Sequence, residues 1–133
     1  GQGMSVVTQT KVASPFTAVP PVYTAAASAA AGAAETFTIK PDCDDIREVI
    51  LVRNGSTDKT VTVYFECNEN APRPTTAAQT IGPGTECAIA VDSALLKKAD
   101  GGFSLVAVPP ADTALSGCSF SVASLGMRQT PLY

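Results

Sequence analysis

The clearest pattern in the chain is a pair of runs rich in β-branched and aromatic residues, 46–53 and 60–67. A polar segment that opens with Asn54-Gly55 separates them. Asn and Gly tolerate the positive φ of tight turns, so the pattern predicts a β-hairpin with a connection of about six residues. Apolar residues fill both faces of the first run, which is typical of a strand covered on both sides. The cover comes either from the domain itself or from another subunit.

Shorter apolar or alternating runs predict further strands, because turn residues such as Gly and Pro separate them. The other predicted strands are residues 6–10, 36–40, 77–81, 85–91, 103–108 and 118–125, and residues 94–98 are predicted to form one helical turn. This spacing predicts an all-β fold. We expect a single antiparallel β-sandwich or barrel-like domain of six to seven strands, with one short helical turn.

The first 34 residues differ from the rest in composition. Lys11 is their only charged residue, and their prolines favour extended backbone and remove hydrogen-bond donors. Residues 25–34 contain eight alanines, a run too short to span a bilayer and best interpreted as a linker. We therefore divide the chain into an extended Pro/Ala-rich N-terminal arm, residues 1–34, and a β-sandwich domain, residues 35–133.

The arm carries apolar side chains that would promote aggregation if nothing covered them. It packs either on its own domain or on a neighbouring subunit, and the sequence leaves both alternatives open. The candidate partner-binding residues are Pro15, Phe16, Val19, Pro20, Pro21, Val22 and Tyr23.

The composition of the chain excludes several classes of function. The 133 residues suffice for one domain with its own core, and a net charge of −3 argues against a non-specific nucleic-acid binder. With 45% hydrophobic and 16% charged residues, the chain resembles a globular protein and not a membrane protein. It contains no histidine, which removes the commonest general base and metal ligand and excludes a Ser-His-Asp or Cys-His mechanism within the chain.

Four cysteines, Cys43, Cys67, Cys87 and Cys118, permit two interpretations. An even number suggests disulfides. The last three, however, fall in register with the apolar positions of predicted strands, where a free cysteine behaves as a small hydrophobic residue. No pair has the C-x₂₋₄-C spacing of a zinc site.

The remaining candidate motifs favour structural interpretations. Asp42, Asp44 and Asp45 lack the pattern of a calcium loop and are interpreted as a solvated acidic turn. Asn54-Gly55-Ser56 matches a glycosylation sequon but is interpreted as a turn. Glu48 and Glu66 lie on adjacent predicted strands, yet nothing near them suggests a cleft. We expect no catalytic, cofactor-binding or metal-binding residue, and no enzymatic activity.

From Glu35 onward, the order of these elements resembles a family of small head proteins of tailed bacteriophages. The segments that carry the resemblance are residues 35–39, 49–55, 59–63, 81–89, 92–98 and 100–102. They are structural motifs and cover roughly the last hundred residues.

The resemblance implies a virion protein that decorates and stabilises the capsid surface after assembly in the host cytoplasm. Its implied partners are the major capsid protein and copies of itself, with a trimer favoured, and neither nucleic acid nor a membrane. The alternative is a carbohydrate-binding adhesin or fibre domain on a virion or cell surface. Low aromatic content, 6% with no Trp, disfavours that alternative because sugar sites use aromatic faces.

Overall fold

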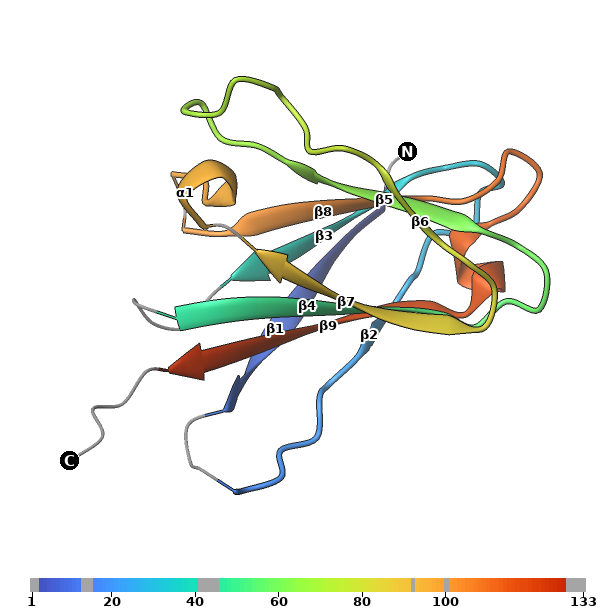
Figure 1. The fold of residues 1–133 in the computed structure, drawn as a ribbon. Coiled ribbons are helices and arrows are strands. Elements are labelled where there is room, and N and C mark those ends of the chain that lie inside the picture. The colour runs from blue at the N-terminus through green and yellow to red at the C-terminus, as the bar shows by residue number, and fades with distance from the viewer. Residues whose placement is uncertain (1–2, 13–15, 41–45, 92, 100, 129–133) are drawn as a thin grey trace.

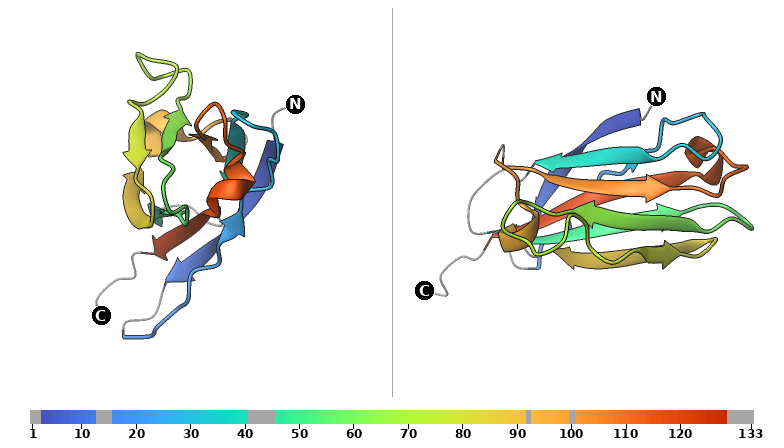
Figure 2. Two further views of the ribbon diagram at one scale, coloured as in Figure 1. Left: turned by 90° about the vertical axis from the view of Figure 1, so that its right-hand side faces the viewer. Right: turned by 90° about the horizontal axis from the view of Figure 1, so that it is seen from above.

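A computed structural model describes residues 3–12, 16–40, 46–91, 93–99 and 101–128. These residues form an all-β fold whose strands curve into a nearly closed barrel (Figure 1, Figure 2). The elements are β1 (Gly3–Val12), β2 (Thr24–Ala25), β3 (Glu35–Lys40), β4 (Ile46–Asn54), β5 (Val61–Glu66), β6 (Gln79–Ile81), β7 (Thr85–Val91), α1 (Ser93–Leu96), β8 (Phe103–Val108), η1 (Leu115–Cys118) and β9 (Phe120–Arg128). The all-β, barrel-like prediction is confirmed, but the described residues form nine strands and not six or seven.

The strands follow the order β6-β5-β8-β3-β1-β9-β4-β7, and β2 pairs with β9 beside this path. The first half of β1 pairs with β3 and its second half with β9, so one strand joins the two sides of the barrel. Both of these pairings are parallel, whereas the other ladders are antiparallel. The sheet is therefore mixed, which corrects the expectation of a purely antiparallel fold. Residues 3–12, which we assigned to the arm, are part of the barrel.

The predicted hairpin is wrong, although both of its strands exist. β4 pairs with β7 and β9, whereas β5 pairs with β6 and β8 on the other side of the barrel. Their connection crosses from one side of the barrel to the other, and Asn54 and Gly55 do not close a tight turn between them. A side chain on Gly55 would come within 2.8 Å of Ser119 Cβ, so glycine allows β4 to end against the start of β9.

Asn54 fixes this crossing. Its side chain is fully buried, and its amide nitrogen donates to the carbonyl oxygens of Lys59 at 2.8 Å and Ile81 at 2.9 Å. Its side-chain oxygen accepts the N–H of Ser56 at 3.0 Å. One amide thus joins the end of β4, the connection and β6. Asn54, the asparagine of the sequon, is fully buried and ends β4, so it does not form the turn that we expected there.

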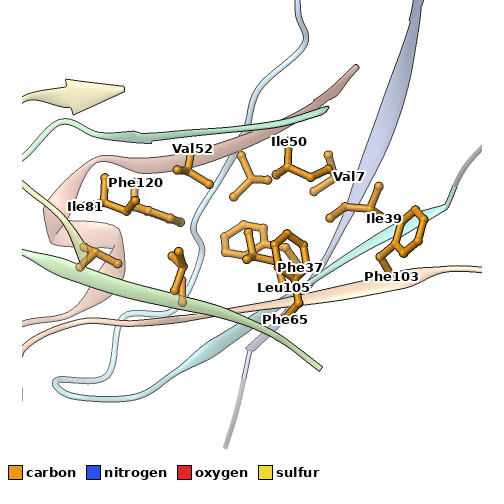
Figure 3. Close-up of a cluster of buried hydrophobic side chains, with 14 of the residues drawn as sticks. Val7, Phe37, Ile39, Ile50, Val52, Phe65, Ile81, Phe103, Leu105 and Phe120 are labelled. Atoms are coloured by element: carbon orange, nitrogen blue, oxygen red, sulfur yellow. The ribbon is translucent and has the colours of Figure 1, made fainter. Parts of the chain in front are cut away.

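Alternate residues of the strands point inward and form one apolar core (Figure 3). Phe37 and Phe120 pack with their ring centroids 5.9 Å apart, from opposite sides of the barrel. Each fully buried residue of this size contributes about 1.5–3 kcal/mol relative to an exposed one. The strict alternation in β3 and β5 agrees with the sequence pattern.

The interior also holds two buried carboxylates, and β1 supplies a partner to each. The Ser5 hydroxyl donates to Glu35 at 2.6 Å, and the Gln9 amide donates to Glu48. Glu48 also accepts a hydrogen bond from Ser124 on β9. Because Ser5 and Gln9 flank the buried Val7 at spacings of two, all three point inward together. These contacts fix the register of β1.

The three cysteines that the structure describes agree with the second interpretation, in which they act as small hydrophobic residues. Cys67 and Cys87 are half-buried against the core, Cys118 is fully buried, and all three are free thiols. Cys118 lies in η1 and not in the strand where we expected it. Burial raises the pKa of its thiol above the ordinary value. Cys43 and the acidic turn at Asp42, Asp44 and Asp45 lie outside the described residues.

Replacement of Asn54 tests the crossing. Asn54→Ala leaves buried carbonyl groups without their donor, so the free energy of unfolding should fall by about 1–3 kcal/mol. Urea denaturation measures this loss. Asn70→Ala, in an exposed loop, is the matched control and should change stability by less than about 0.5 kcal/mol. Equal losses in both variants would contradict the assigned role.

Candidate functional site

The first candidate site is the segment between β1 and β2. Residues 16–23 leave the barrel, extend beyond it and return along β9 (blue in Figure 1; Figure 2). Phe16 is completely exposed and Val22 is 58% exposed. We call residues 16–22 the arm tip. It presents apolar side chains to solvent, as expected of a surface that binds another molecule.

Phe16 is held in an unusual backbone conformation. Its φ of +61° lies in the left-handed region, which costs a residue with a side chain about 1–2 kcal/mol. Such positions concentrate at functional sites in proteins. This strain makes Phe16 a candidate functional residue, because its side chain is completely exposed.

Tyr23 fastens the base of the arm tip to the outside of the barrel. The Arg53 guanidinium lies 4.2 Å from the centre of the Tyr23 ring, a cation–π contact. The Tyr23 hydroxyl donates to Glu86, and Arg53 pairs with the same carboxylate at 3.3 Å. Burial raises the pKa of Tyr23, and the hydrogen bond from Tyr23 lowers the pKa of the Glu86 carboxyl. We call Tyr23, Arg53 and Glu86 the latch.

The alanine-rich run is anchored by a buried carboxylate. Glu35 is fully buried and accepts the N–H groups of Ala27 at 2.8 Å and Ser28 at 2.7 Å. Further along, the N–H of Gly32 donates to the carbonyl oxygen of Thr113 at 2.9 Å. Residues 24–32 therefore dock on their own barrel. Of the two alternatives for the arm, this part therefore packs on its own domain and not on a neighbouring subunit.

The structure separates the sequence-predicted residues into two groups. Tyr23 belongs to the latch, and Val19 and Pro21 are half-buried. Phe16, Pro20 and Val22 are exposed, and Pro15 lies outside the described residues. The sequence analysis missed Arg53 and Glu86. They are directly opposite each other in the β4–β7 ladder, a pairing that the predicted hairpin concealed.

The second candidate site is a groove of about 550 Å³ where the barrel fails to close. On one side lie β5 and the chain that leads into β6, with Val63, Phe65 and Thr76. On the other side lies β7, with Ala88 and Ala90. We call it the seam groove. None of the described lining residues carries a formal charge. The volume lies within the range of about 300–1,000 Å³ that is usual for ligand sites.

The outer edge of β7 forms one wall of the seam groove. Among the described residues β7 pairs only with β4, and β6 pairs only with β5. Half of the backbone N–H and C=O groups of an edge strand point away from its single partner and can accept a further strand. The seam groove thus combines an apolar lining with a sheet edge. Sequence analysis did not identify it, because its walls are joined only in three dimensions.

The two glutamates considered as a catalytic pair are not brought together. Glu48 is buried between Gln9 and Ser124, whereas Glu66 pairs with Lys98 at 2.7 Å. Burial raises the pKa of Glu48, although the hydrogen bonds from Ser124 and Gln9 act in the opposite direction. These interactions give each carboxylate a structural role, and the two strands that carry them do not pair.

Two further properties concern the residues that the structure describes. They contain no cluster of three or more potential metal ligands. None of the helices in this part of the chain is long and apolar enough to cross a membrane. The chain matches no protein-family model and no curated protein sequence.

The latch leads to a prediction about the arm tip. Tyr23→Ala removes both the ring under Arg53 and the hydroxyl, so the arm tip should be cut by proteinase K roughly two- to fivefold faster. Tyr23→Phe retains the ring and should give a smaller increase. Mass spectrometry of the first products locates the cut. Unchanged cleavage in Tyr23→Ala would show that the latch does not restrain the arm tip.

Glu48 leads to a prediction about pH. Because its pKa is higher in the folded protein than in the unfolded chain, its favourable contribution is complete below about pH 4.3, the ordinary glutamate value. That contribution is lost as the pH rises through the folded pKa. The side chain of the Glu48→Gln variant stays neutral at every pH. The stability of this variant, relative to the natural chain, should therefore increase as the pH rises above about 4.3 and then level off. Urea denaturation of both proteins between about pH 4 and pH 8 measures the difference. A constant difference would contradict the assignment.

Proposed function

We propose that this protein is a non-enzymatic structural subunit of a tailed-phage virion, bound to the capsid surface as a decoration or cement protein. The observation that carries the proposal is the arm tip. An apolar segment with a fully exposed Phe16 is fastened at its base to a rigid barrel. An exposed apolar segment of this kind usually marks a surface that a binding partner covers.

The resemblance to small phage head proteins supplies the identity of the partner. The segments that carry it contribute to strands β3 to β7 and to α1, which form much of the barrel wall. In this proposal the barrel is the main body of the subunit, and the arm tip makes the contact with the major capsid protein. The subunit acts on the outer surface of the virion, after assembly in the host cytoplasm.

The mechanism of stabilisation is mass action. A subunit that binds the assembled shell but not its separated parts lowers the free energy of the shell. At a free concentration 100 times the dissociation constant, this gain is about 2.7 kcal/mol for each site. Many identical sites on one shell multiply the effect. No catalytic step is required.

The carbohydrate-binding alternative gains no support from the two candidate sites. Among the described lining residues of the seam groove, Tyr64 and Phe65 are aromatic, and Thr76 and Gln79 provide the main polar side chains. Sugar recognition requires several convergent polar groups around an aromatic face. The arm tip offers one aromatic ring, that of Phe16, and one side-chain hydroxyl, that of Thr17.

Purified heads of the encoding phage test the proposal. Heads that lack the protein should lose their DNA at a lower temperature than heads saturated with it, because each bound subunit stabilises the shell. Scanning fluorimetry with a DNA dye measures the release temperature. Equal release temperatures at saturation would overturn the cementing role.

Arm-tip variants assign the contact. Phe16→Asp should reduce retention on heads, since it places a charge in the buried interface. Met4→Asp is the matched control, because Met4 is 76% exposed on β1, away from the arm tip. Sedimentation of the heads followed by gel densitometry quantifies the bound protein. Equal retention of both variants would place the contact elsewhere on the subunit.

A further inference from the structure

The outer edge of β7 lacks the features that protect natural sheet edges. Proteins shield such edges with short strands, bulges, proline or lysine. β7 is seven residues long, and each residue from Glu48 to Asn54 on β4 faces one of its residues, so the ladder contains no bulge. The strand contains no Lys, Arg, Pro or Gly. By contrast β6, at the other end of the strand order, has only three residues. The β7 edge is therefore open to a further strand.

The side chains of β7 determine which strand can be added. One face of β7 packs against the core, and the other face is exposed to solvent. The core face carries Cys87, Ile89 and Val91, and the exposed face carries Glu86, Ala88 and Ala90. An added strand must supply N–H and C=O groups along the edge and apolar side chains on the face that lies over the seam groove.

β7 of a second copy meets these requirements. It is extended, each of its residues has an N–H, and its two faces are the same. The other described strands with a single partner, β6 and β2, have three and two residues and are too short to cover this edge. The arm tip is unsuitable, because Pro20 and Pro21 have no N–H and Phe16 has a φ of +61°.

A two-fold axis through Ala88 gives the pairing. In an antiparallel ladder the N–H and C=O of one residue point to the same side of the strand, and successive residues alternate. An axis through a residue joins positions of equal parity, so outward groups of one copy meet outward groups of the other. Ala88 is the middle residue of β7, so an axis there also pairs Thr85 with Val91 of the second copy and uses the whole strand.

This register brings no like charges together. Glu86, the only charged residue of β7, faces Ala90 of the second copy and not another glutamate. Its carboxylate remains paired with Arg53 on β4 and with Tyr23. On the core face, Ile89 of the added strand lies opposite Cys87 and covers part of the apolar lining of the seam groove. Charge and hydrophobic burial thus favour the same register.

We propose that two copies of this protein pair through β7, antiparallel and in register about Ala88, so that one sheet continues through both barrels. The contact uses the same surface of each copy, so it is isologous and closes with two copies. This proposal goes beyond the proposed function. It also differs from the trimer that the family resemblance implies.

Charges at the centre of the contact test it. Ala88 faces Ala88 of the second copy, so Ala88→Lys and Ala88→Glu each place like charges directly opposite each other. Each variant should associate roughly tenfold more weakly or less than the natural chain. An equimolar mixture of the two places opposite charges against each other and should restore a two-chain complex. Analytical ultracentrifugation measures association, and native mass spectrometry identifies the mixed pair.

Ala90→Lys is the matched control, because it introduces the same charge two residues along the same exposed face. In this register it faces Glu86 of the second copy, so association should be at least as strong as in the natural chain. Circular dichroism and thermal melting establish that each variant folds. Deuterium exchange of the natural chain needs no substitution. Amides on the outer edge of β7 should exchange in separated molecules and become protected as the concentration rises.

Several results would overturn the proposal. A natural chain that stays monomeric up to about 0.5 mM excludes the contact, and a trimer excludes its two-fold symmetry. A mixture of Ala88→Lys and Ala88→Glu that stays monomeric excludes the pairing about this residue. Equal weakening by Ala88→Lys and Ala90→Lys excludes the register.

Binding to heads separates this proposal from the proposed function. Phe16 is not part of the β7 contact, so Phe16→Asp should reduce retention on heads but associate like the natural chain. If the natural chain pairs through β7 but neither binds nor stabilises heads, the decoration role fails and the β7 contact stands. If it binds heads but stays monomeric, the β7 contact fails and the decoration role stands.

Discussion

The structure depends on the double pairing of β1. One ten-residue strand continues from one side of the barrel to the other, in parallel with β3 and then with β9. Its inward residues alternate polar, apolar, polar, and each polar residue reaches a buried carboxylate. A shift of one residue would turn Val6 and Thr8 inward and leave Glu35 and Glu48 without these donors. Each buried carboxylate would then lose one of its hydrogen bonds, and this loss opposes the shifted register.

The same constraint explains how an apolar arm is held on a small domain. Glu35 accepts hydrogen bonds from β1 and also from Ala27 and Ser28, so one buried side chain connects the strand with the alanine-rich run. The latch adds a second attachment at Tyr23. Among the described residues between β1 and this attachment, those of the arm tip extend from the barrel. The exposed segment is short and anchored at its base. It therefore loses less conformational entropy on binding than a flexible linker would.

Much of the fold followed from local sequence pattern. The bounds of β7 and β8 agree with the predicted residues 85–91 and 103–108, because turn residues delimit both strands clearly. Strand pairing was harder to predict. Asn-Gly after β4 resembles a hairpin turn, but here the asparagine bonds across the barrel and the glycine permits close approach of Ser119. Local pattern cannot distinguish these uses of the same two residues.

The candidate sites, too, were predictable from the sequence only in part. Phe16 and Tyr23 were evident as apolar residues in an uncharged segment. The latch required the β4–β7 register, and the seam groove required the relative positions of β5 and β7, neither of which is encoded in adjacent residues. Composition also assigned β1 to the arm, because Lys11 is the only charged residue among the first 34, although residues 6–10 were predicted to form a strand.

The incomplete closure of the barrel has a dynamic consequence. β9 lies between β4 on one side and β1 and β2 on the other, whereas β7 is held on one side only. Amide hydrogens of β9 should therefore exchange with deuterium only when the whole domain unfolds, while those on the outer edge of β7 exchange from the native state. Local stability thus decreases around the ring toward the seam, so the molecule loosens first at the edge where another chain can join it.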